Sequence, residues 1–118
     1  MPYARKDLLT WQKGMYYHIY NRGVNRSTIF REPRNYLLVI SKIKEYSRAN
    51  HLTMISYCLE PNHYHFLTRQ DGDEPASNLP QFVFNSYTKA YNKTYNHSGT
   101  LFEGRFRAKP VQTSSHLL

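Results

Sequence analysis

Two histidines separated by one residue, His63 and His65, are the residues of this chain whose type and spacing are best suited to chemistry. In a β-strand the side chains alternate between the two faces, so both imidazoles would point the same way, with their Cα atoms roughly 6.6 Å apart. Imidazole is a common metal ligand, and two imidazoles on one face can bind a single cation. Such pairs also occur on ordinary strand surfaces. The spacing alone therefore leaves both a metal site and a solvated strand face open.

The elements that would position this pair follow from hydrophobic periodicity and turn signals. Alternating or β-rich runs predict strands, and apolar residues at steps of three and four predict helices. The expected strands are residues 15–20, 52–59, 63–69 and 100–111, and the expected helices are residues 33–49 and a segment beginning at Leu79. The order β-α-β-β-α-β predicts an α+β fold of the ferredoxin-like type, an antiparallel sheet with two helices on one face.

The charge of the chain favours a polyanionic partner. The 118 residues carry 16 Lys and Arg against 8 Asp and Glu, a net charge of +8, and 11 of the residues are tyrosines. The positive excess lies in residues 1–34 and 85–118, whereas the middle is nearly neutral. Cations that meet phosphates and rings that stack on bases suit nucleic acid. A solvated basic surface of an ordinary domain is the alternative.

Other features exclude several classes of protein. The mean hydropathy is −0.72 and no apolar run is long enough for a membrane span. Cys58, the single cysteine, cannot form an internal disulfide. The N-terminal residues lack the apolar stretch of a signal peptide. We therefore expect a cytoplasmic protein without a membrane partner, forming a single domain over residues 1–118.

Several ordered segments resemble one family of DNA-processing enzymes. They are YHIYNRG at residues 17–23, IF at 29–30, SYCLEPNHYHFL at 56–67 and GTLFEGRFRAKPV at 99–111. Together they are similar to the REP-associated tyrosine transposases and the related insertion-sequence transposases, which are single-tyrosine HUH transposases. In the HUH motif a bulky residue, here Tyr64, separates the two histidines. The resemblance extends from about Tyr17 to Val111.

The resemblance implies a function and a mechanism. Members of this family cut and rejoin single-stranded DNA near hairpins through a 5′-phosphotyrosine intermediate, leaving a free 3′-OH. It further implies that His63 and His65 bind a divalent metal, Mg²⁺ or Mn²⁺, which polarises the scissile phosphate. Because Mg²⁺ prefers oxygen ligands, we expect phosphate oxygens and one further polar side chain to complete its coordination. The resemblance also implies a homodimer whose sheets join across the two-fold axis.

The catalytic tyrosine of the family lies on a helix after the last strand. Here residues 112–118 are similar to the opening of that helix and contain no tyrosine. We therefore expect the nucleophile beyond Leu118, so that this chain lacks the C-terminal helix that carries it. Tyr87 and Tyr91 are the alternatives within the chain. Both lie on the apolar stripe of the second helix, where core packing is the favoured interpretation.

Basic residues inside the family motifs are the candidates for contacts with DNA, since Arg can bind phosphate through two parallel hydrogen bonds. The candidates are Arg22, Arg26, Arg105, Arg107 and Lys109. His18 could neighbour the metal site, although a half-buried, hydrogen-bonded histidine is the favoured role. A non-catalytic ferredoxin-like module that binds nucleic acid, or a domesticated relative, remains the alternative function. Metal binding discriminates between them, because a simple binding module does not need His63 or His65.

Overall fold

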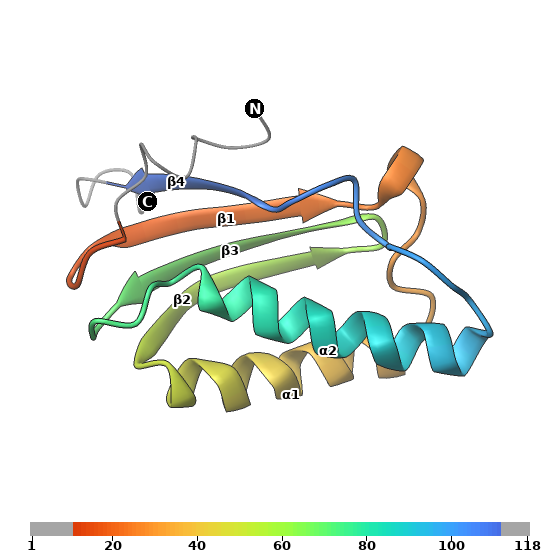
Figure 1. Ribbon diagram of the computed structural model, residues 1–118, viewed down its shortest axis with the longest axis horizontal. Coiled ribbons are helices and arrows are strands. Elements are labelled where there is room, and N and C mark those ends of the chain that lie inside the picture. The colour runs from red at the N-terminus through yellow and green to blue at the C-terminus, as the bar shows by residue number, and fades with distance from the viewer. Residues whose placement is uncertain (1–10, 112–118) are drawn as a thin grey trace.

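The structure, a computed structural model, describes residues 11–111. Its four strands form one antiparallel sheet in the order β2-β3-β1-β4, and two long helices cover one face of it (Figure 1). The strands are β1 (Tyr16–Arg22), β2 (Leu52–Glu60), β3 (His63–Gln70) and β4 (Arg107–Val111), and the helices are α1 (Pro33–Ala49) and α2 (Asn78–Tyr95), with a short 3₁₀ turn η1 (Val24–Arg26). This arrangement confirms the predicted ferredoxin-like α+β fold.

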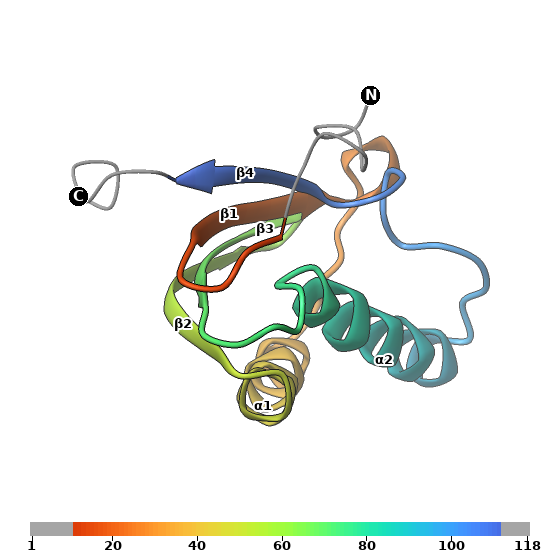
Figure 2. The same ribbon diagram turned by 60° about the vertical axis from the view of Figure 1, so that its left-hand side comes forward.

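The two helices form where local sequence signals and burial agree. Helix α1 begins at Pro33, a residue suited to the first helical turn, and the Glu32 amide donates to Asn35 Oδ1 at 3.0 Å. Its buried residues recur every four positions, from Asn35 to Ser47. Helix α2 buries Leu79, Val83, Tyr87 and Tyr91 in the same way. Both helices therefore present one stripe to the same face of the sheet (Figure 2).

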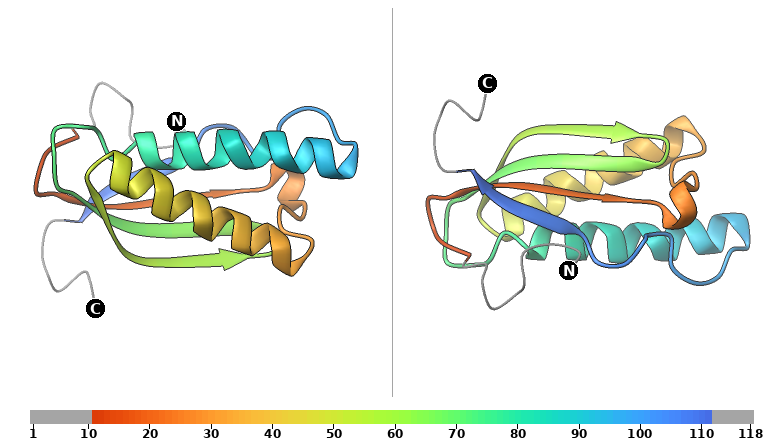
Figure 3. Two further views of the ribbon diagram at one scale, coloured as in Figure 1. Left: turned by 90° about the horizontal axis from the view of Figure 1, so that it is seen from below. Right: turned by 90° about the horizontal axis from the view of Figure 1, so that it is seen from above.

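The two faces of the sheet have different chemistry. Tyr17 and Ile19 of β1, and Tyr64 and Phe66 of β3, are at most 1% exposed and pack beneath the helices. The alternate residues of these strands, including both histidines of the His-x-His pair, point to the opposite face. Figure 3 shows that the helices lie behind the sheet when this second face is viewed from above. We call it the open face, because no helix of residues 11–111 covers it.

The last strand is shorter than the sequence predicts. We expected it over residues 100–111, but β4 begins only at Arg107. Residues 99–106 instead connect α2 to β4, with Leu101 and Phe102 buried and Gly104 at a φ of 74°. Only an isolated bridge links Phe102 to Gly23. The prediction was wrong here because burial against the end of β1, and not strand pairing, produced the apolar pattern.

Within residues 11–111, no helix combines the length and the apolar character that crossing a membrane requires.

Candidate metal centre

A pocket of about 410 Å³ lies on the open face, where the end of β1 meets the start of β3. Its lining includes His63, His65, Tyr20, Arg22, Arg26 and Arg107. Sheet register explains this gathering, because Arg22 pairs with His63 and Tyr20 pairs with His65, while β4 places Arg107 opposite Tyr20. The predicted histidine pair therefore shares one pocket with three of the five predicted DNA-binding residues.

The two histidines of the pair lie close together on the open face. Their ring centroids are 5.2 Å apart and the ring planes cross at 85°. His63 Nδ1 lies 2.8 Å from Asn62 Oδ1, and because that amide oxygen accepts, His63 carries its proton on Nδ1 and keeps Nε2 for a ligand. In the part of the chain that the structure describes, no third imidazole, thiol or carboxylate joins them in a metal-binding cluster. The pair fits a cation that takes its other ligands from water or phosphate.

His18 of β1 contacts the second histidine of the pair. Its Nε2 lies 3.0 Å from His65 Nδ1, and the two rings are nearly parallel, at 10°. Burial lowers the pKa of His18, and the nearby His65 and Lys109 lower it further. Burial and the neighbouring His63 also lower the pKa of His65. Near neutral pH both rings are therefore neutral, which is the form that binds a metal.

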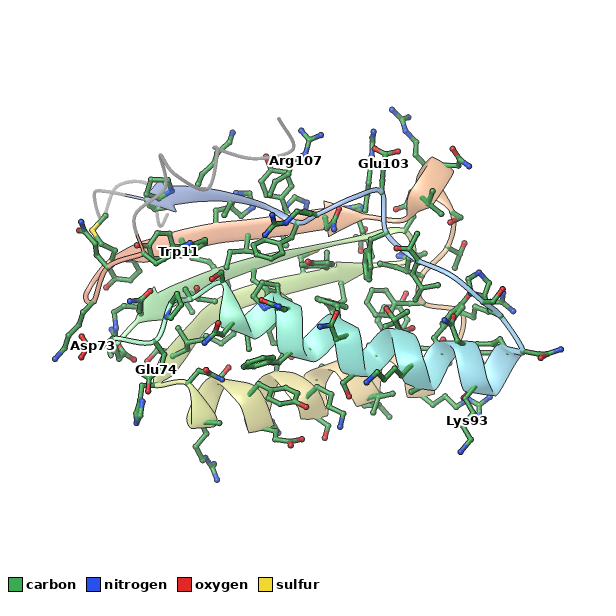
Figure 4. The ribbon with its side chains drawn as sticks, viewed as in Figure 1. Trp11, Asp73, Glu74, Lys93, Glu103 and Arg107 are labelled. Carbon is green, nitrogen blue, oxygen red and sulfur yellow. The ribbon has the colours of Figure 1, made fainter. Side chains whose placement is uncertain are left out.

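The predicted DNA-binding residues fall into different environments. Arg22 donates to Glu103 Oε2 through Nε at 2.9 Å and Nη2 at 2.7 Å, so its charge is already paired. Arg26 and Arg107 line the pocket, and neither forms an ion pair with a carboxylate of residues 11–111. Figure 4 shows Arg107 and Glu103 on the side of the sheet away from the helices. Arg26 and Arg107 are thus the cations of this pocket that remain uncompensated.

The other two predicted contacts lie outside this pocket. Arg105 lines a separate groove of about 540 Å³ between α2 and the connection to β4. Lys109 is exposed on β4 and pairs in register with His18, one step along the open face. The structure therefore brings Arg22, Arg26 and Arg107 to the histidines and leaves Arg105 beside a different surface.

Four residues of the pocket were not predicted as site residues: Tyr20, Asn21, Asn62 and Glu103. Glu103 pairs with Arg22 and so ties residues 99–106 to the end of β1. Asn62 orients His63 from the β2–β3 turn. Both lie inside the motifs quoted above, and that position was the signal that could have identified them. Their partners are fixed by tertiary contacts, which sequence spacing does not reveal.

Tyr87 and Tyr91, the alternative nucleophiles within the chain, both lie in the core on α2. Tyr87 is 1% exposed, and its hydroxyl donates a hydrogen bond to the Ile29 carbonyl. Burial raises the pKa of Tyr87 and so opposes the phenolate form that attacks phosphorus. This helix lies on one side of the sheet (Figure 2), and the histidine pocket lies on the opposite, open face. The expected segment after Val111 lies outside the described residues.

Comparisons with known proteins agree with this geometry. Among solved structures, a REP-associated tyrosine transposase bound to a REP hairpin matches with a TM-score of 0.72 and 17% identity, over 92% of this chain and 63% of that one. A Deinococcus radiodurans R1 protein, provisionally described as a transposase, matches with a TM-score of 0.66 and 10% identity, over 92% of this chain and 88% of that one. At these identities the two matches show the fold.

The sequence comparison identifies the family. No curated protein matches the chain. This chain spans 63% of the length of the hairpin-bound transposase structure. The family model described as "Transposase IS200 like" matches residues 11–117, which is nearly the whole sequence. The chain therefore belongs to the IS200-like transposase family.

Proposed function

We propose that this chain binds hairpin-bearing single-stranded DNA and holds Mg²⁺ or Mn²⁺ at His63 and His65, as part of a single-tyrosine HUH transposase. The observation that carries the proposal is the shared pocket. The imidazoles of His63 and His65 face the same space as the guanidiniums of Arg26 and Arg107, which form no ion pair with a carboxylate of residues 11–111. The transposase with the similar fold is bound to a REP hairpin, which supports DNA as the partner.

The residues of the pocket would prepare a phosphodiester for attack. Arg26 and Arg107 bind backbone phosphates and place one of them beside the histidines. Asn62 keeps the proton of His63 on Nδ1, so that Nε2 faces a cation. A bound divalent ion supplies Lewis-acid polarisation of the scissile phosphate.

The covalent step of the proposal is a phosphoryl transfer. A tyrosine oxygen bonds to phosphorus as the bond to the 3′-oxygen breaks, which yields a 5′-phosphotyrosine and a free 3′-OH. The phenolic proton passes to solvent or a base, and the departing 3′-oxygen takes up a proton from solvent. Tyr87 does not fit this role, because its hydroxyl is buried in the core and donates to the Ile29 carbonyl.

A coupling experiment tests the proposal against the non-catalytic alternative. If the metal and a scissile phosphate share the pocket, Mn²⁺ should increase the affinity for a hairpin-bearing single strand, because binding of either ligand favours binding of the other. Fluorescence anisotropy at constant ionic strength, with and without Mn²⁺, measures this. A hairpin affinity that does not respond to Mn²⁺ favours a binding module without a metal role.

His18 is expected to position His65 for the metal. If His65 binds a cation through Nε2, its proton sits on Nδ1 and is donated to His18 Nε2, 3.0 Å away. His18→Phe keeps the ring stacked but removes the acceptor. Losing such a partner typically weakens metal binding about 10–100-fold. We therefore expect a Mn²⁺ affinity at least roughly tenfold weaker, measured by isothermal titration calorimetry.

The conservative variant provides the control for His18. His18→Gln supplies an amide oxygen that can accept the same proton, so it should restore most of the Mn²⁺ affinity. Nitrogen-15 spectra of the imidazoles report independently on which nitrogen of His65 carries the proton. The positioning role is wrong if His18→Phe binds Mn²⁺ as tightly as the unaltered chain.

We also propose that the chain pairs with a second copy through β2. This strand forms one edge of the sheet, and the exposed side chains of Ile55 and Tyr57 lie on it. An edge strand offers unpaired backbone groups to another sheet. Sedimentation equilibrium should show a dimer that Ile55→Lys converts to monomer. A monomer at all concentrations would contradict this proposal.

A further inference from the structure

A second, smaller pocket lies beside the η1 turn. It has a volume of about 210 Å³ and is bounded by the segment after β1, by α2 and by the connection to β4. Its polar lining comprises Ser27, Thr28, Arg31, Tyr91, His97 and Thr100, and contains no carboxylate. Hydroxyl, guanidinium and imidazole groups can all donate hydrogen bonds. This lining therefore complements an anion.

Arg31 gives this pocket an oriented positive charge. Its Nε donates to Tyr91 Oη at 2.7 Å, and its guanidinium carbon lies 4.5 Å from the ring centroid of Tyr95. These contacts fix the plane of the guanidinium, and within residues 11–111 they use only one of its five N–H donors. The terminal nitrogens keep their donors for a ligand.

Arg31 also lacks an ion pair with a carboxylate in the described part of the chain. Three arginines of the described chain contact a carboxylate: Arg22, Arg34 and Arg69. The carboxylate of the adjacent Glu32 accepts hydrogen bonds from the Tyr95 hydroxyl and from Arg34. A fixed guanidinium that forms no ion pair within residues 11–111, in a small pocket with several hydroxyls, suits an external anion.

The arrangement favours a phosphate group. The hydroxyls of Ser27 and Thr28, and that of Tyr91 on α2, line the same pocket as the planar guanidinium, which suits the several acceptor oxygens of a phosphate. The η1 turn separates this pocket from the metal centre, since Arg26 lines the metal pocket and Ser27 lines the smaller one. A strand that crosses the turn can therefore place phosphates in both.

We propose that Arg31, Ser27 and Thr28 form a second phosphate site, which binds one backbone phosphate of the DNA outside the linkage held at the metal centre. The assignment of an anion site does not depend on the proposed function. The identification of DNA as the source of the phosphate rests on that function. Occupation of both sites would fix the path of the strand across the η1 turn.

Two variants compare Arg31 with a matched arginine. Arg31→Gln should weaken hairpin binding several-fold at about 0.1 M salt and reduce the slope of log affinity against log salt by about one. Arg34→Gln removes the same charge three residues along the chain, but Arg34 already forms an ion pair with Glu32. It should change the slope much less. Equal slopes for Arg31→Gln and the unaltered chain would overturn the proposal.

A titration with inorganic phosphate separates this site from the proposed function. With chloride adjusted to hold the ionic strength constant, the Nε–H signal of Arg31 should shift and saturate in nitrogen-15 spectra. Thr28→Val, which keeps the side-chain shape, should weaken that response even if Arg31→Gln fails to fold. A saturable shift without any hairpin binding would retain the anion site and reject DNA as its source. No shift with phosphate would reject the site itself.

Discussion

Replacing both His63 and His65 with alanine is expected to abolish binding of Mn²⁺ to this chain. Removing a residue that only supports a metal ligand weakens binding about 10–100-fold, so removing both ligands should exceed about 100-fold. Within residues 11–111 no group of three or more potential metal ligands exists that could replace them. Isothermal titration calorimetry with Mn²⁺ would measure the loss directly.

The controls for this prediction lie elsewhere on the molecule. His51 is exposed and paired with Glu74, away from the pocket, so His51→Ala should bind Mn²⁺ as the unaltered chain does. The double variant should still bind hairpin DNA without metal, because Arg26 and Arg107 remain. Undiminished Mn²⁺ binding by the double variant would show that the metal site is elsewhere.

Removing the two uncompensated arginines of the pocket should have the second largest effect. Each phosphate contact contributes about 0.9 to the slope of log affinity against log salt. The double variant Arg26→Ala/Arg107→Ala should therefore flatten that slope by roughly two and weaken hairpin binding on the order of 50-fold near 0.1 M salt. Fluorescence anisotropy across a salt series measures both quantities.

A charge-matched variant shows whether the effect is local. Lys44 and Arg48 are exposed on α1, which lies on the other side of the sheet from the pocket. Lys44→Ala/Arg48→Ala removes the same two charges and should change hairpin affinity far less. If both double variants weaken binding equally, the basic charge acts as a diffuse field, and the pocket is not the DNA site.

Local sequence signals were sufficient for most of the fold. The predicted helix over residues 33–49 coincides with α1, because Pro33 and the four-residue spacing of its buried side chains agree. The strand that carries His63 was also predicted, since its alternation matches one buried and one open face. In these elements, local preference and burial favour the same structure.

The sequence-based predictions fail where segments far apart in the sequence come into contact. In a continuous strand over 100–111, Arg105 and Arg107 would share one face. Because β4 begins at Arg107 and Gly104 takes a positive φ, Arg105 instead lines a different groove. The contact of His18 with His65 likewise depends on how β1 and β3 pair, and no spacing within one strand reveals that register.

The most direct test of the account is the position of a metal ion in a complex with DNA. A crystal of the chain with a hairpin-bearing single strand and Mn²⁺ would locate the ion by its anomalous scattering. The account predicts one Mn²⁺ coordinated by Nε2 of His63, Nε2 of His65 and a phosphate oxygen, with Arg26 and Arg107 on neighbouring phosphates. Mn²⁺ bound away from the two histidines, or DNA lying on another face of the sheet, would contradict it.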